Sequence, residues 1–198
     1  RMTDIFQGTF EQRDEAAKQL LRIEDSFDLI RRRFMIGGKQ AAFYTVDGFL
    51  KGEVSEKVME FFSKITEEQM PEDFAGFLQQ QIPYLDLMKV ADQEMFVKSV
   101  LSGMSCLMVE GYDIILALDF REYPSRSVDE PDKDKVLRGS RDGFIESLIP
   151  NMALIRRRIR DTDLSFELVG VGRSSKTDVA ICYMQTRVNP GVPRAGQK

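Results

Sequence analysis

Pairs of short apolar runs, separated by one or two glycines, constrain most strongly how this chain can fold. Glycine accepts the positive φ angles of tight turns at little steric cost, so each pair predicts two antiparallel strands joined by a hairpin. The runs and their glycines are, in chain order, 27–36, Gly37-Gly38, 40–46, and then 104–109, Gly111, 113–119. Each run is also too short to span a membrane as a helix, which needs about 20 apolar residues.

Helical spacing of apolar residues fills most of the remaining chain. The predicted helices are 10–23, 55–65, 71–81, 93–102 and 141–160. Ser55 and Asp92 are suited to cap two of them, and Pro71 suits a first helical turn. A short strand is predicted at 84–90, and two longer strands at 164–171 and 177–185.

This order of elements predicts a mixed α/β (α+β) fold. We expect two small lobes, each a mostly antiparallel or mixed sheet flanked by helices. The expected boundaries are 10–90 for the N-terminal lobe and 91–188 for the C-terminal lobe. Residues 189–198 are rich in proline and glycine and are expected to be a flexible tail or an expression-derived end.

Composition argues against several classes of function. The net charge is −4, which disfavours broad binding to nucleic acid. The chain has no histidine, the commonest general acid or base and metal ligand near neutral pH. We therefore expect no enzyme activity, no cofactor and no metal. Cys106 and Cys182 lie in apolar runs and are expected to be buried, reduced thiols.

The segment GVGRSSKT at 170–177 is one residue away from a nucleotide-binding phosphate loop. Such a loop must follow a strand and open a helix, whose first amides bind the phosphate. The residues that follow here, TDVAICYM, have the composition of a strand. The segment is therefore predicted to be a hairpin turn.

The predicted helix 141–160 carries the most unusual pattern in the chain. Its core stripe is predicted to be Phe144, Leu148, Met152, Ile155 and Ile159. Pro150 and Leu154 lie on the opposite face beside Arg157, an arrangement suited either to a protein contact or to cover by another part of the chain. The arginines either pair locally with acids or take part in the contact. The candidate interface or switch residues are Arg141, Glu146, Pro150, Leu154, Arg156, Arg157 and Arg158.

Three consecutive arginines occupy the predicted strand 27–36. Alternation places Arg31 and Arg33 on one face and Arg32 on the other. An edge strand or a cluster of salt bridges between lobes explains them, and an anion or lipid-headgroup site is the alternative. The candidate residues of a ligand cleft between the lobes are Arg31, Arg33, Lys176 and Asp178.

Several of these stretches resemble one known family. They are RGSRDGFIESLIPNMALIRRRIRD (138–161), VGRSSKTDVAICYM (171–184), the dipeptide EP (130–131) and IGGKQAAFYTVDGF (36–49). Together they resemble the A-subunit (GerA) family of spore germination proteins, over about residues 27–188. Receptor A subunits more often have Pro and Glu at the positions of Ser140 and Asp142, so the sequence is more similar to the branch of stage V sporulation protein AF.

The resemblance implies a soluble N-terminal domain of two α/β lobes, without catalytic residues, followed by a membrane-spanning region. It also implies a place in the inner spore membrane, with this domain on the cytoplasmic (spore core) side. The partners implied are other germination-complex subunits, the membrane-spanning region of the same protein and a second copy. We expect a role in assembly and signal transmission during germinant response and ion release. The alternative is a small-molecule (germinant) or anion binding module with its ligand between the lobes.

Overall fold

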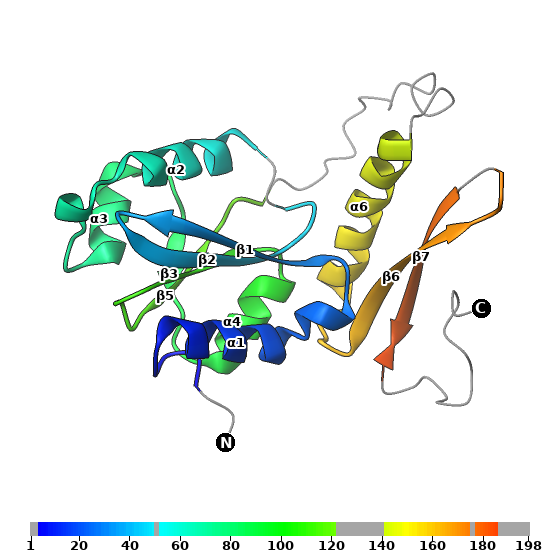
Figure 1. Ribbon diagram of the computed structural model, residues 1–198, viewed down its shortest axis with the longest axis horizontal. Helices are drawn as coiled ribbons and strands as arrows, with labels where there is room; N and C mark the ends of the chain where they lie inside the picture. The colour runs from blue at the N-terminus through cyan, green and yellow to red at the C-terminus, as the bar shows by residue number, and fades with distance from the viewer. Residues whose placement is uncertain (1–3, 50–51, 122–140, 175–176, 186–198) are drawn as a thin grey trace.

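The computed structural model describes residues 4–49, 52–121, 141–174 and 177–185, and within residues 141–147 it describes the backbone alone. Of the sequence-based expectations, Lys176 and the tail 189–198 lie outside the described residues. The described residues form two parts (Figure 1). We call residues 4–121 the main lobe and residues 141–185 the hairpin lobe.

The main lobe is built on one five-stranded sheet in which every neighbouring pair is antiparallel. Its strands are β1 (Leu29–Ile36), β2 (Lys39–Val46), β3 (Leu87–Lys89), β4 (Ser105–Val109) and β5 (Ile115–Leu118), in the spatial order β1-β2-β4-β5-β3. Both predicted hairpins are confirmed. Ile36 pairs with Lys39 across Gly37 and Gly38, whose φ angles are 53° and 76°, and Gly111 at 83° lies between β4 and β5.

The expected lobe boundary near residue 90 does not separate the sheets. β2 pairs with β4, and β3 pairs with β5, so strands from both sides of residue 90 share one sheet. The sheets instead divide between β5 and the elements that follow it. Pairing between strands more than 60 residues apart, such as Phe43 with Leu107, leaves no local pattern in the sequence.

Helices cover both faces of the five-stranded sheet (Figure 1). The main lobe contains α1 (Phe10–Leu21), α2 (Glu53–Lys64), α3 (Phe74–Gln81), α4 (Gln93–Leu101) and the 3-10 turns η1 (Ile23–Asp25) and η2 (Glu67–Gln69). Along β2, Ala41 and Phe43 enter the core under α2 and α3, whereas Ala42 and Tyr44 enter the core under α1 and α4. All four are buried, so β2 is apolar on both faces.

The helix ends agree with sequence expectation at one cap and differ at two. Asp92 accepts a hydrogen bond from the Met95 N–H and caps α4, as predicted. Ser55 is not a cap, because α2 begins at Glu53 and the Ser55 hydroxyl donates to the Gly52 carbonyl. Pro71 lies outside α3, which Asp73 caps by accepting from the Gly76 N–H.

The hairpin lobe consists of α6 (Arg141–Arg158), β6 (Leu164–Val171) and β7 (Thr177–Met184). β6 and β7 form an antiparallel two-stranded sheet on which α6 packs. The segment GVGRSSKT therefore joins two strands, as predicted, and does not open a helix. The mixed α/β fold is confirmed. Across the part of the chain that the structure describes, no helix is long and apolar enough to cross a bilayer.

Candidate functional site

The two lobes meet at a buried arginine on the inner side of α6. The Arg156 side chain is 0% exposed and that of its partner Asp28 is 2% exposed. Arg156 Nε donates to Asp28 Oδ2 at 2.8 Å, and Nη2 donates to Asp28 Oδ1 at 2.8 Å. This two-point geometry is the stronger form of an arginine–carboxylate pair. The guanidinium also lies 5.2 Å from the centre of the Phe166 ring.

Neighbouring groups satisfy the other polar atoms of this junction. Arg156 donates from Nη1 to the Asp161 carbonyl and from Nη2 to Ser26 Oγ, both at 3.0 Å. Ser26 Oγ donates to Asp28 Oδ1 at 2.6 Å and accepts from the Phe166 N–H at 2.8 Å. A buried ion pair offsets its desolvation cost only when such additional hydrogen bonds are present. The junction is therefore a completed network around one charge pair.

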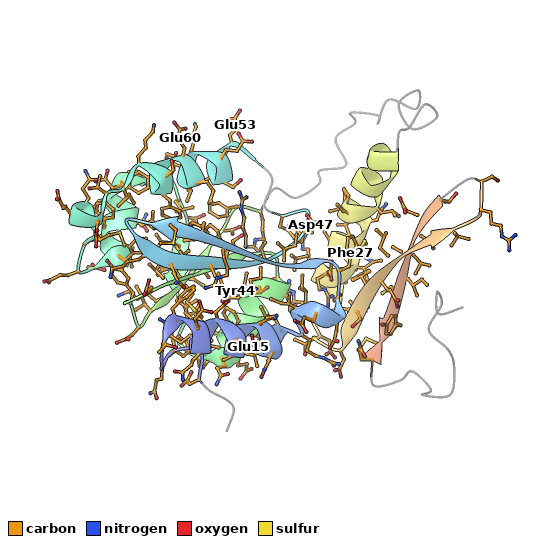
Figure 2. The ribbon with its side chains drawn as sticks, in the orientation of Figure 1. Glu15, Phe27, Tyr44, Asp47, Glu53 and Glu60 are labelled. Carbon is orange, nitrogen blue, oxygen red and sulfur yellow. The ribbon has the colours of Figure 1, made fainter. Side chains whose placement is uncertain are left out.

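Further contacts fasten the segment before β1 to the hairpin lobe. The Phe27 N–H donates to the Phe166 carbonyl at 3.0 Å, and Figure 2 labels Phe27 where the lobes meet. Arg22, at the C-terminal end of α1, donates from Nη1 to Asp163 Oδ1 at 2.6 Å. Side chains and backbone of residues 22–28 thus bind the start of β6 and the turn before it.

The middle of α6 packs closely against the turn that follows β2 in the main lobe. Gly48 follows β2 with a φ of 94°, and a Cβ there would lie 3.0 Å from Ile149 Cγ2 and 3.4 Å from Ala153 Cβ. Ala153 also belongs to an apolar cluster with residues at the end of the main sheet, Leu29, Val46, Phe49 and Leu101. α6 therefore contacts the main lobe through Ile149, Ala153 and the pair of Arg156 with Asp28, and it packs on β6 through Met152 and Arg156.

The predicted core stripe of α6 is partly wrong. Met152 is buried as expected, but Ile155 is 38% exposed and Ile159 is 43% exposed. The buried face is instead centred on Met152, Ala153 and Arg156, because the buried acid Asp28 lies under it. Ile159 cannot share that face, since it follows the last helical residue, Arg158. Arg156 was expected at an interface or switch, flanking the core, and the structure places it at the centre of the contact between the lobes.

The candidate residues Pro150, Leu154, Arg157 and Arg158 lie outside this buried face, and together with the exposed Ile155 we call them the outer strip. Pro150 and Arg158 are exposed, Leu154 is 40% exposed, and Arg157 is half-buried. The exposure of Pro150 and Leu154 agrees with the predicted outward face. Of the other two candidates, Arg141 and Glu146, only the backbone in α6 is described.

Arg31 and Arg33 share one face of the edge strand β1, and that face lies against α1. Arg31 donates to both carboxylate oxygens of Asp14, at 2.8 and 2.5 Å, and Arg33 pairs with Glu11. The edge strand, one of the two explanations predicted, is confirmed. The other, a salt-bridge cluster between lobes, is wrong for Arg31 and Arg33, because their salt bridges lie within the main lobe.

Asp14 is the buried centre of that arginine cluster. Burial acts to raise the pKa of Asp14, but hydrogen bonds from Arg31 and Tyr44 outweigh it and hold the pKa below its ordinary value. Burial, together with the hydrogen bond to Asp14, raises the pKa of Tyr44. The Arg31 guanidinium is therefore already occupied by a carboxylate of its own lobe.

Of the four predicted cleft residues the structure describes three, and Asp178 lies apart from Arg31 and Arg33. Asp178 is buried on β7, opposite Gly170, whereas Arg31 and Arg33 belong to the other sheet. A groove of about 340 Å³ does lie between the two lobes, along residues 23–27 and one side of β6. Its charged lining residues are acidic: Glu24, Asp25 and Glu167.

The described residues offer little reactive chemistry. Within the described ranges, no group of three His, Cys, Asp or Glu side chains is placed to hold a metal ion. Cys106 is buried as predicted, and burial raises its pKa. Cys182 is exposed, contrary to expectation, because α6 covers only part of the two-stranded sheet.

Sequence reasoning missed Asp28 and Ser26 as functional candidates. The one available signal was an acid between Phe27 and Leu29, at the start of an apolar run, where a charged residue is seldom buried without a partner. Its partner Arg156 lies 128 positions away, so the sequence could not pair them.

Comparison with known proteins places this chain in a family. The chain is similar to Stage V sporulation protein AF of Bacillus subtilis (strain 168), with 31% identity over 93% of this chain and 38% of that protein. It is similar to Spore germination protein A1 of the same organism, with 25% identity over 90% of this chain and 36% of that protein. The chain thus spans little more than a third of the length of these relatives.

The fold matches the crystal structure of the N-terminal domain of the A subunit of the Bacillus megaterium spore germinant receptor GerK3. The TM-score is 0.67 and the identity 20%, over 96% of this chain and 69% of that one. These relatives have the names of receptor and sporulation proteins rather than of enzymes. The model of the Bacillus/Clostridium GerA spore germination protein family matches residues 17–194, and this chain belongs to that family.

Proposed function

We propose that this chain acts in assembly and signal transmission during the response of spores to germinants and the accompanying ion release. In this proposal it is the N-terminal domain of a membrane protein of the inner spore membrane, on the cytoplasmic (spore core) side. Its partners are other subunits of a germination complex, the membrane-spanning region of the same protein and a second copy. Family membership and the names of the relatives support this setting.

The observation that carries the proposal is the double attachment of α6. Its inner face binds the main lobe at Gly48 and Asp28 and the hairpin lobe at Phe166. Its outer strip remains accessible at Leu154 and Arg158. A partner that bound the outer strip and shifted α6 would change the contact between the lobes, since packed interfaces have discrete arrangements rather than continuous ones.

The test uses charge and size changes on the outer strip of the full-length protein in spores. Arg158→Glu and Leu154→Ser are expected to slow germination at least several-fold. The isolated domain should keep its thermal midpoint, since both side chains are exposed. Arg32→Glu, an exposed arginine on β1, is the matched control and should germinate normally. Normal germination of both outer-strip variants would refute the role of α6.

A second candidate function is small-molecule binding between the lobes, favoured by the groove beside β6. Its acidic lining suits a cationic or zwitterionic ligand better than the anion expected from the sequence. Titration of the chain with amino acids, sugars and nucleosides at millimolar concentration, followed by NMR, tests this function. Saturable shifts at Glu24, Glu167 and Tyr183 would support it, and an unchanged spectrum across the panel would exclude these ligands.

A further inference from the structure

One edge of the two-stranded sheet is only partly paired. The Gln185 N–H donates to the Asp163 carbonyl, and this bond determines which residues of β6 direct their backbone groups toward β7 and which direct them away. In an antiparallel pair, every second residue directs its N–H and C=O to its partner strand, and the residues between direct theirs to the other side. Phe166, Leu168 and Gly170 are therefore directed away from β7.

The contacts of Phe166 confirm this direction. Its N–H donates to Ser26 Oγ and its carbonyl accepts from the Phe27 N–H, so residues 26–27 occupy the outer side of β6 at this position. Two and four residues further along, Leu168 and Gly170 present the same backbone groups to the same side. No backbone partner for them is found among the described residues. The edge is thus paired at its start and open along the rest.

Space for a partner lies beside the open part. The groove of about 340 Å³ lies between residues 23–27 and the two-stranded sheet, where residues 166–168 of β6 and Tyr183 and Gln185 line it. Beyond it the hairpin projects from the molecule at the right of Figure 1. A Cβ added to Gly170 would meet no atom within 4 Å. The sheet surface at Gly170 is therefore open among the described residues.

The hairpin also has apolar surface that α6 does not cover. Cross-strand pairing places Val169, Val171 and Val179 on the face opposite Leu164 and Phe166, which pack against α6. Val171 is 51% exposed and Val179 is 38% exposed. A two-stranded sheet is marginally stable by itself and becomes stable with added strands or covering layers. An open edge beside such a face is a site for strand addition.

We infer that the open edge of β6 is the docking site for a further strand of the same full-length protein, from outside residues 1–198. The relatives favour this occupant over a separate partner. This chain covers 38% of the length of Stage V sporulation protein AF. In the match to the GerK3 domain, 96% of this chain is aligned, but only 69% of the GerK3 domain is covered. This assignment is independent of the role proposed for α6.

Gly170 offers a matched pair of variants for the test. Gly170→Pro removes the outward N–H and leaves the β6–β7 ladder intact, because Gly170 does not bond to β7. Gly170→Ala keeps the N–H and has free space for its methyl group. The readout is hydrogen–deuterium exchange of a peptide covering residues 166–174, measured by mass spectrometry in the 198-residue chain and in the full-length protein.

In the full-length protein, the Leu168 and Gly170 amides are expected to exchange at least about tenfold more slowly than in the 198-residue chain. Gly170→Pro should restore fast exchange at Leu168 in the full-length protein, and Gly170→Ala should not. Equal exchange in the two unmodified proteins would overturn the inference. A dimer of the shorter chain that Gly170→Pro dissociates would overturn it too, because a second copy would then be the occupant.

Discussion

The main lobe and the hairpin lobe are stabilised in different ways. In the main lobe, helices cover both faces of the five-stranded sheet, and apolar side chains fill a core on each side. In the hairpin lobe, one helix covers one face of a two-stranded sheet, and its small core contains Met152, Leu164 and Phe166. The hairpin lobe therefore depends on the Arg156–Asp28 pair for its position, whereas the main lobe depends on buried apolar area.

The arginine pairs of the two regions show the same difference. Arg31 and Asp14 join β1 to α1 within a lobe whose apolar core already fixes both elements. Arg156 and Asp28 join two lobes whose other contacts are a small apolar cluster around Ala153 and the hydrogen bonds of residues 22–27. Regions with few buried apolar contacts open at lower free energy than a core sheet. A change of arrangement is thus expected between the lobes before it occurs within the main one.

The largest effect is expected from breaking the pair between the lobes. Arg156→Leu leaves the buried Asp28 without its positively charged partner, and should lower the free energy of unfolding by about 3–5 kcal/mol. The measurement is urea denaturation followed by circular dichroism, since the chain has no tryptophan. Arg158→Leu removes an exposed arginine two residues away and should change stability by less than about 0.5 kcal/mol. Equal losses in the two variants would contradict the dependence on Arg156.

The next effect is expected at the close approach of α6 to the main lobe. Gly48→Ala requires an L-residue at a φ of 94° and places a methyl group 3.0 Å from Ile149. We expect a loss of about 1–3 kcal/mol in thermal denaturation. Gly170→Ala, in open space without positive φ, is the matched control and should stay within about 0.5 kcal/mol of the parent chain. A harmless Gly48→Ala would mean that α6 can move off this turn without cost.

Within the main lobe, Asp14 should give a smaller and pH-dependent effect. Its pKa is lowered in the folded chain, so its contribution is complete above the unfolded value of about 4 and is lost as pH falls through the folded value. Asp14→Asn should cost about 1–2 kcal/mol at pH 7 and reduce the loss of stability as the pH falls below about 4. Denaturation at several pH values measures both. An unchanged pH profile would show that Asp14 does not contribute to acid sensitivity.

The smallest effect is expected from the exposed pair in the same cluster. Glu11→Gln leaves Arg33 in contact with Gln40 and the Phe10 ring, and should cost less than about 1 kcal/mol. The loss should decrease further at high salt, because both side chains are accessible. A loss as large as that of Arg156→Leu would remove the difference between exposed and buried arginine pairs.

Local patterns in the sequence predicted most of the elements. The glycines at 37–38 and 111 identified both hairpins of the main sheet, and Asp92 identified the start of α4. Each signal acts over a few residues, which is the range over which turn and cap chemistry operates. The composition of the arginine strand also indicated an edge position correctly.

Apart from the helix starts near Ser55 and Pro71, the main failures involve distant partners. The periodicity of α6 assigned Ile155 to the core because isoleucine is apolar, but the buried position went to Arg156, whose partner Asp28 lies at the other end of the chain. The order β1-β2-β4-β5-β3 likewise depends on pairing across residue 90, which no local pattern reports. The family resemblance supplied the setting of the protein but not the residues of the junction.

The long separation in sequence between Asp28 and Arg156 has a kinetic consequence. The hairpins of the main lobe close short loops and can form early, whereas the junction closes a loop of well over one hundred residues and should form after the folding transition state. Loss of the junction should then accelerate unfolding and leave the folding rate nearly unchanged. The same late contact would be the first to open under mechanical pull, so the two lobes could separate and close again while the five-stranded sheet stays folded.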